Sequence, residues 1–97
     1  MKVKVKAIHF DAAEKLMNFI NKKAEKLGKH YEDITEVEVA LKVIKPETSM
    51  NKEAGVKLIS PEHEDLFASK VADTFEEAID LSIEALEKQL EKKKAKK

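Results

Sequence analysis

The residues whose type and spacing most clearly indicate a chemistry are lysines near the ends of two predicted helices. Residues 72–87 contain six acidic residues and no lysine, whereas residues 88–97 contain six lysines and one glutamate. The formal net charge of zero therefore conceals a strongly cationic end of the chain. Salt limits the reach of surface charge to about 8–10 Å, so distant acidic residues need not cancel this patch. A concentrated cationic patch on a small domain favours binding to a polyanion.

Eight lysines form the predicted binding set. They are Lys22, Lys23, Lys26 and Lys29 on the first predicted helix, and Lys88, Lys92, Lys93 and Lys94 on the last. If the two helices lie side by side, their outer surfaces are expected to form one cationic shelf. All 19 basic residues are lysines, which contact phosphates as point charges and lack the planar fork with which arginine reads base edges. Six phosphate contacts on a duplex predict a log–log salt slope of roughly −5. A competing interpretation is that these lysines only complement the helix dipoles and aid solubility.

Other site chemistries find little support in the sequence. There is no cysteine, and His9, His30 and His63 are far apart and outside any metal-ligand spacing. The four serines lack the G-x-S-x-G context of a nucleophile, and two glycines are too few for a phosphate-binding loop. We therefore expect no enzyme activity, no metal, no cofactor and no small-molecule substrate. A cleft with convergent polar groups around His63 or His9 would favour an enzyme instead.

The hydrophobic pattern predicts the elements that position the lysines. Residues 2–8, 34–43, about 53–60 and about 65–71 are predicted strands, with a loop over 44–52 and a turn over 60–63. Two apolar stripes at spacings of three and four predict helices that begin at Asp11 and Asp73, each with a glutamate three residues later as in a capping box. The first helix is expected to end near Gly28 or to extend to Tyr31. The last is expected to end near residue 94.

These elements predict one α+β domain over residues 1–97, with the order β-α-β-β-β-α. Both helices are expected to pack on one face of a four-stranded sheet. The opposite face should be solvated, because it carries Lys2, Lys4, Lys6, Glu36, Glu38 and Lys42. A weak homodimer through that face is left open. The absence of an apolar run near the roughly 20 residues that span a bilayer predicts a cytoplasmic protein with no membrane partner.

Two segments resemble the signatures of the ribosome hibernation-promoting factors, a family that includes the ribosome-associated inhibitor A. Residues 22–43 (KKAEKLGKHYEDITEVEVALKV) are similar to the pattern K-x-x-K-L-x-x-Y/F-x-D-x-I-x-x-V-x-V-x-L-K-V. The stretches FASKVADTFEEAID and ALEKQLEKKK are similar to the second signature of that family. The chain departs from the pattern at Glu76 and Glu77, where many members have Tyr-Ala, and at Ala85, where some have lysine.

The resemblance implies a β-α-β-β-β-α domain that binds the small ribosomal subunit and its rRNA. It implies that bound protein overlaps the paths of mRNA and tRNA, and so silences and preserves ribosomes in stationary phase or stress. The basic rRNA-facing positions of the family correspond to Lys23, Lys26, Lys88, Lys92 and Lys94, while Lys22, Lys29 and Lys93 are added from charge. The chain lacks the extra C-terminal domain of the long members, so we expect the short class.

An alternative hypothesis is a protein-interaction module that uses the acidic residues between Asp73 and Glu87 as its contact surface. That hypothesis predicts ribosome association with little or no salt dependence. It also predicts that reversing Asp80 and Glu84 matters more than reversing lysines. The RNA-binding hypothesis predicts the opposite result on both counts.

Overall fold

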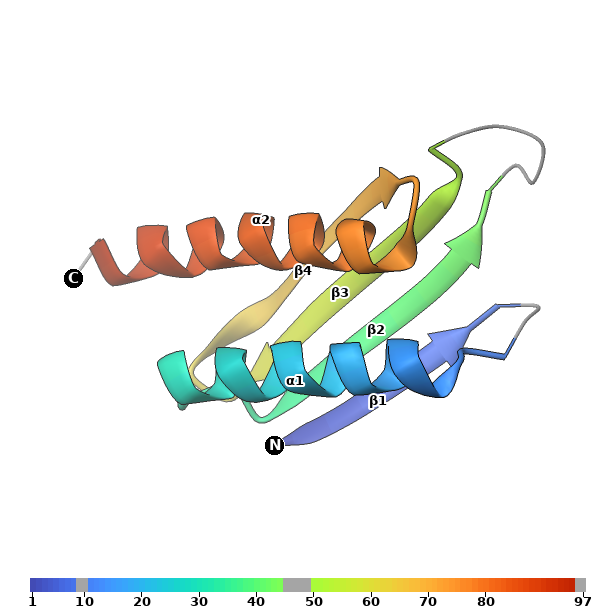
Figure 1. The fold of residues 1–97 in the computed structure, drawn as a ribbon. Helices are drawn as coiled ribbons and strands as arrows, with labels where there is room; N and C mark the ends of the chain where they lie inside the picture. The colour runs from blue at the N-terminus through green and yellow to red at the C-terminus, as the bar shows by residue number, and fades with distance from the viewer. Residues whose placement is uncertain (9–10, 45–49, 96–97) are drawn as a thin grey trace.

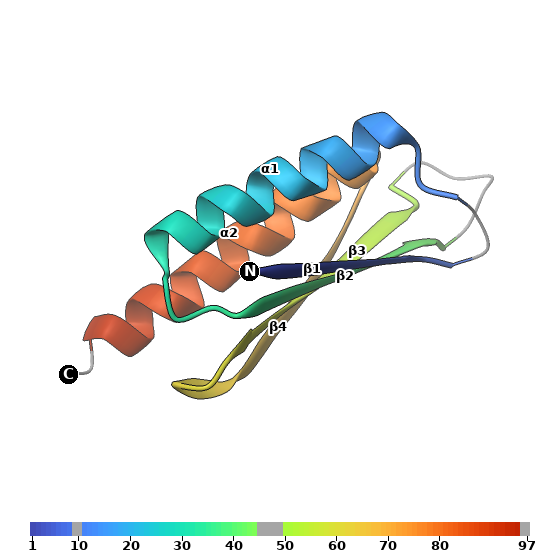
Figure 2. The same cartoon turned by 90° about the horizontal axis from the view of Figure 1, so that it is seen from below.

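The structure is a computed structural model, and it describes residues 1–8, 11–44 and 50–95, with side chains up to Lys92. The elements follow the order β1 (Lys2–Ala7), α1 (Glu14–His30), β2 (Glu36–Val43), β3 (Lys52–Ser60), β4 (His63–Ala72) and α2 (Phe75–Ala95). Figures 1 and 2 show two layers, with both helices on the same side of the four-stranded sheet. The predicted fold class and element order are confirmed.

The sheet has the strand order β1-β2-β3-β4 and is mixed. β1 pairs in parallel with β2, because α1 returns the chain to the end of the sheet at which β1 began. β2, β3 and β4 pair antiparallel, as expected from their short connections. The predicted turn after β3 lies at residues 61–62 and joins β3 to β4. Of the predicted loop over 44–52, residues 45–49 lie outside the described part of the chain.

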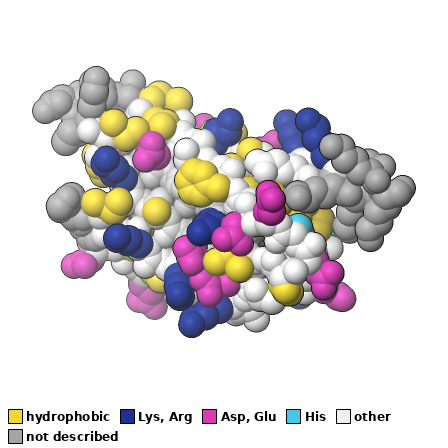
Figure 3. Space-filling view, turned by 180° about the vertical axis from the view of Figure 1, so that it is seen from behind, with side chains coloured by type: hydrophobic (Ala, Val, Ile, Leu, Met, Phe, Trp, Pro, Cys, Tyr) yellow, Lys and Arg dark blue, Asp and Glu magenta, His cyan; other side chains and the backbone are white. Residues whose placement is uncertain are grey.

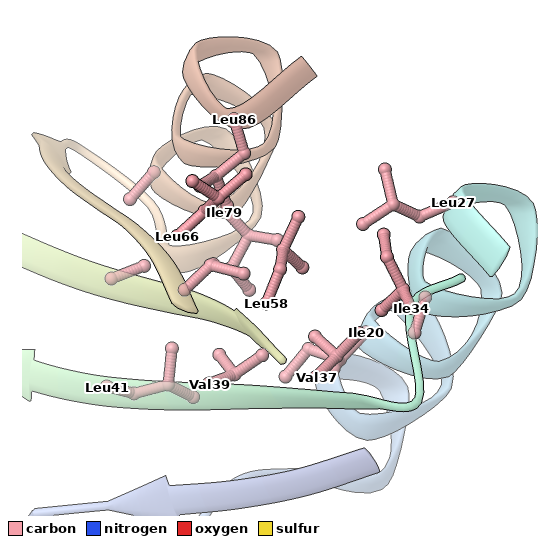
Figure 4. Close-up of a cluster of buried hydrophobic side chains, with 14 of the residues drawn as sticks. Ile20, Leu27, Ile34, Val37, Val39, Leu41, Leu58, Leu66, Ile79 and Leu86 are labelled. Atoms are coloured by element: carbon pink, nitrogen blue, oxygen red, sulfur yellow. The ribbon is translucent and has the colours of Figure 1, made fainter. Parts of the chain in front are cut away.

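One hydrophobic core lies between the sheet and the helices (Figure 4). The alternation of β2 places Val37, Val39 and Leu41 on the helix side, where each is at most 3% exposed. α1 contributes Leu16, Ile20, Ala24 and Leu27, and α2 contributes Ala78, Ile79, Ser82, Leu86 and Leu90. Ser82 is fully buried, and its hydroxyl lies 2.9 Å from the carbonyl oxygens of both Ala54 and Ala78. The apolar stripes therefore fix which helix surfaces remain free.

Both predicted helix starts are wrong in detail. α1 begins at Glu14 rather than Asp11, and its first turn has no side-chain cap, because residues 11–13 still carry the chain from the sheet to the helix layer. α2 begins at Phe75, and Thr74 replaces Asp73 as its cap, since Thr74 Oγ1 accepts the Glu77 N–H at 3.1 Å. Asp73 is occupied elsewhere, because its Oδ1 accepts the backbone N–H of Met50 at 2.7 Å.

The face of the sheet opposite the helices is open to solvent, as predicted (Figure 3). Lys2, Lys4, Lys6 and Lys42 are exposed on this face, and Glu36 and Glu38 are half-buried. Lys4 pairs with Glu36 at 3.7 Å, and Lys57 pairs with Asp65 at 3.5 Å. β4 resolves an ambiguity of the sequence, since Leu66 faces the core and Phe67 faces solvent. This open face is separate from the surface that carries the helix lysines.

Candidate nucleic-acid interface

The two helices place their lysine-rich halves at the same end of the molecule. Figure 1 shows α1 and α2 running in the same direction across the sheet, with α2 extending beyond its edge. Lys22, Lys26 and Lys29 are exposed on α1, and Lys88 and Lys92 are exposed on α2. Among the residues that the structure describes, none of these five ammonium groups has an acidic oxygen within 4.0 Å. They are therefore available to an external anion.

Lys23 is held differently from its neighbours. Its Nζ lies 2.8 Å from Oδ1 of Asp80 on α2, and it lies 5.4 Å from the centroid of the Phe19 ring. This ion pair joins the two helices across their outer surfaces. Because the side chains of Lys23 and Asp80 are 35% and 45% exposed, the pair contributes only about 0–1 kcal/mol to stability. The Asp80 carboxylate therefore competes with an external phosphate for the Lys23 ammonium.

A groove of about 260 Å³ between α1 and α2 contains charges of both signs. α1 lines it with Lys23, Lys26, Leu27 and His30, and α2 lines it with Asp80, Ile83, Glu84 and Glu87. Burial raises the pKa of Tyr31, and the nearby Glu87 and Glu91 raise that pKa further. We call Asp80, Glu84, Glu87 and Glu91 the acidic strip. It occupies the side of α2 that faces α1, so the two helices do not form the single cationic shelf expected from the sequence.

Lys88 and Lys92 lie on the adjacent side of α2, next to the edge strand β4. A hollow of about 400 Å³ there is lined by Lys70, Lys88, Lys92, Leu81, Glu84, Ala85 and Gln89. We call Lys70, Lys88 and Lys92 the flank cluster. Sequence reasoning missed Lys70, although its alternation with Leu66 and Ala68 could have placed it on the helix side of β4. The flank cluster brings three cations from two elements around one hollow that contains a single acid.

The predicted set also contains Lys93 and Lys94. These two residues follow Lys92 within α2, and their side chains lie outside the described residues. The candidate interface therefore consists of two separate groups: the α1 lysines (Lys22, Lys26 and Lys29) and the flank cluster. The acidic strip runs between these two groups. Such an arrangement can meet two stretches of phosphate that are separated by a gap, rather than one continuous anionic surface.

The acidic residues of α2, and Asp73 just before it, are partly engaged within the protein. Asp73 accepts the Met50 N–H at 2.7 Å, and Asp80 is paired with Lys23 at 2.8 Å. Glu76 is half-buried in the first turn, where acidic side chains complement the helix dipole. The acidic surface that a protein-interaction module would use is thus smaller than the sequence indicates.

Polar contacts link the β3–β4 turn to the loop before β2 through Ser60, His63 and Asp33. The Ser60 hydroxyl donates to Asp33 Oδ2 at 3.0 Å, and His63 Nε2 lies 3.2 Å from the same oxygen. The serine therefore faces the carboxylate and not the imidazole, which is the wrong order for activating a serine nucleophile. His9 lies outside the described residues. Within the described part of the chain, no group of three His, Cys, Asp or Glu residues could hold a metal ion.

Comparison with solved structures establishes the fold. A ribosomal subunit interface protein from Coxiella burnetii superposes with a TM-score of 0.81 at 21% identity, covering 98% of this chain and 99% of that one. The N-terminal domain of Protein Y from Thermus thermophilus superposes with a TM-score of 0.76 at 16% identity, covering 95% of this chain and 98% of that one. The two-layer β-α-β-β-β-α arrangement is therefore shared with proteins of quite different sequence.

Comparison of sequences identifies the family. The profile of the family described as sigma 54 modulation protein / S30EA ribosomal protein matches residues 3–97, and the chain belongs to this family. It is 29% identical over 100 residues to the ribosome hibernation promoting factor of Pseudomonas putida, covering 99% of this chain and 89% of that protein. The family resemblance inferred from the sequence is confirmed. None of the helices formed by the described residues has the length and apolar character needed to cross a membrane.

Proposed function

We propose that this protein binds the small ribosomal subunit through lysine contacts with rRNA phosphates. Bound there, it blocks the access of mRNA and tRNA, and it inactivates and preserves ribosomes in stationary phase or stress. The mechanism is occupancy of a site, with no catalytic step. Membership of the S30EA family and the name of the Pseudomonas putida relative support this proposal.

The observation that carries the proposal is the common orientation of the two helices. Since both run the same way (Figures 1 and 2), their C-terminal halves lie at one end of the domain, and these halves carry Lys22, Lys26 and Lys29 on α1 and Lys88 and Lys92 on α2. Rigid helices place the cations before binding, so little side-chain and backbone ordering is needed in the complex. Lysine ammonium groups suit recognition of phosphate positions and RNA shape, which does not require base readout.

The fold and the proposed function use opposite sides of the same helices. Leu16, Ile20 and Leu27 bury one side of α1 against the sheet, and Lys22, Lys26 and Lys29 lie outside that buried stripe. The same division holds on α2, where Leu86 and Leu90 are buried and Lys88 and Lys92 are exposed. Charge substitutions at the exposed lysines should therefore test binding without unfolding the domain.

The experiment is charge reversal in the flank cluster. We expect the double variant Lys88→Glu/Lys92→Glu to lose cosedimentation with purified small subunits. Loss of two phosphate contacts alone lowers the affinity roughly 60-fold at about 0.1 M salt, and repulsion by the new carboxylates lowers it further. The thermal midpoint should change little, because both lysines are exposed.

The matched control is Lys15→Glu/Lys42→Glu, which makes the same change in net charge. Lys15 lies in the first half of α1 and Lys42 on the open sheet face, and both are exposed. The control should cosediment like the unmodified protein. Equal loss in both double variants would mean that net charge alone governs association, and retention of binding in Lys88→Glu/Lys92→Glu would remove the flank cluster from the interface.

A further inference from the structure

A second surface with binding chemistry lies on the open face of the sheet, away from the helix lysines. Phe67 of β4 is the most exposed large hydrophobic side chain among the described residues, at 59%. Its neighbour Leu66 is 8% exposed and supplies the core contact of this part of β4. The core therefore does not account for the aromatic ring at position 67. Figure 3 shows this face, with hydrophobic side chains set among lysines and acidic residues.

Phe67 lies across a floor of very small side chains. Gly55 of β3 is beneath the ring, since a Cβ built on Gly55 would lie 3.1 Å from Cζ of Phe67. Gly55 pairs with Ala40 on β2 and with Ser69 on β4, so the row beside the ring has no bulky side chain. The ring packs on the Gly55 backbone and leaves much of its surface to solvent. The result is a shallow hollow of about 580 Å³ with an aromatic wall.

Lysines from two strands surround this hollow. Lys4 and Lys6 of β1 and Lys57 of β3 line it, against one acidic residue, Glu38. Among the described residues, Lys6 has no acidic partner within 4.0 Å. Lys4 and Lys57 hold Glu36 and Asp65 at 3.7 and 3.5 Å with side chains 56% and 41% exposed, so these pairs are weak and can exchange for a phosphate.

We propose that the open sheet face binds single-stranded RNA, with an unpaired base stacked on Phe67 and the flanking phosphates held by Lys4, Lys6 and Lys57. An aromatic ring on a β-sheet stacks bases of any sequence, because every base has a π-face. A surrounding set of cations holds the backbone that joins the bases. The floor formed by Ala40 and Gly55 leaves room for a flat base beside the ring.

The charge of the hollow favours RNA over a second copy of the chain. A two-fold contact between copies of this face would bring Lys4, Lys6 and Lys57 toward the same three lysines of the other copy. Glu38 in the hollow, with Glu36 and Asp65 beside it, would offset part of their repulsion. RNA supplies the opposite charge along its whole length, and its unpaired bases supply the apolar surface that the ring requires.

The test separates base stacking from phosphate attraction. The probes are a labelled oligoadenylate of about eight nucleotides and an abasic ribose-phosphate oligomer of the same length, with binding followed by fluorescence anisotropy. The unmodified protein should bind the base-bearing probe about 5- to 100-fold more tightly than the abasic one. Phe67→Ala should abolish that preference and leave the affinity for the abasic probe unchanged. Phe67→Trp should keep the preference.

Ile44→Ala is the matched control, since Ile44 is also an exposed hydrophobic residue, at 42%, and lies outside the hollow. It should bind both probes like the unmodified protein. Equal affinity of the unmodified protein for the two probes, or an unchanged preference in Phe67→Ala, would overturn the proposal. The proposal would also be overturned if sedimentation equilibrium showed a dimer that Phe67→Ala dissociates, because the ring would then be covered by a second copy.

The sheet site and the helix lysines lie on separate surfaces. Lys88→Glu/Lys92→Glu should keep the preference for bases, because Lys88 and Lys92 lie outside the hollow. If that variant retained ribosome binding while Phe67→Ala lost the base preference, the helix interface would fail and the sheet site would stand. The reverse outcome would support the helix interface and remove the sheet site.

Discussion

The ion pair between Lys23 and Asp80 yields the sharpest prediction, because it sets an internal contact against the proposed contact with RNA. The substitution Asp80→Asn removes one charge of the acidic strip and releases the Lys23 ammonium, which now lies 2.8 Å from Asp80 Oδ1. If the space between the two helices faces rRNA, the released lysine gains a phosphate partner. The variant should then bind small subunits more tightly than the unmodified protein.

The magnitude follows from one additional cation–phosphate contact. One contact steepens the log–log salt slope by about 0.9, so the advantage of the variant should grow about eightfold for each tenfold decrease in salt. The cost to folding is small, because both side chains are more than a third exposed and such a pair contributes about 0–1 kcal/mol. For a domain of this size, that loss lowers the thermal midpoint by no more than about 8 °C.

The assay is filter binding of purified small subunits over a series of salt concentrations, with thermal unfolding measured on the same preparations. Asp11→Asn is the control, since Asp11 is exposed before α1 and its removal makes the same change in net charge. The control should leave the slope unaltered. A folded Asp80→Asn variant with unchanged or weaker binding would refute the reasoning, because it would place Lys23 outside the RNA contact.

Three further predictions concern the fold that carries these surfaces. Ser82→Ala removes the buried hydroxyl that reaches the Ala54 carbonyl and should lower the free energy of unfolding by about 0.5–1.5 kcal/mol in urea titrations. Thr74→Ala removes the cap of α2 and should cost about 1 kcal/mol, whereas Thr74→Ser should cost much less. A hydrogen bond with Glu36 raises the pKa of Glu38 above the ordinary value of 4.5, so the native state loses stability relative to Glu38→Gln as pH rises through the window above 4.5. Melting curves of both proteins from acid to neutral pH should diverge in that direction, and parallel curves would contradict it.

The alternation of β2 and the stripes of the helices made the layers predictable from the sequence. Val37, Val39 and Leu41 repeat at period two, and Ile79, Leu86 and Leu90 recur at helical spacing, so the buried surfaces followed from residue order alone. The sequence did not show which of Leu66 and Phe67 faces the core, because two adjacent apolar residues fit either register. Pairing of Leu66 with Leu58 decides it, and that pairing is a contact between strands.

Most lysines of the candidate interface could be named from the sequence, apart from Lys70, but their arrangement in space could not. The acidic strip lies on one side of α2, and Lys88 and Lys92 lie on the adjacent side. Which side faces α1 depends on how α2 packs on the sheet. The same packing places Lys70 of β4 and Lys88 of α2 in the lining of one hollow, although the two residues are far apart in the sequence. The cap of α2 was ambiguous for a similar reason, because Asp73 and Thr74 each have a glutamate three residues later. The hydrogen bond from the Met50 N–H occupies Asp73, and Thr74 caps the helix instead.

The most direct test of the central claim is the salt dependence of cosedimentation with separated ribosomal subunits. Six exposed lysines, Lys22, Lys26, Lys29, Lys70, Lys88 and Lys92, are available to phosphates. We predict pelleting with small but not large subunits, and a log–log slope of roughly −4 to −5 between low and high salt. Pelleting that is indifferent to salt, or equal with the two subunits, would contradict the account.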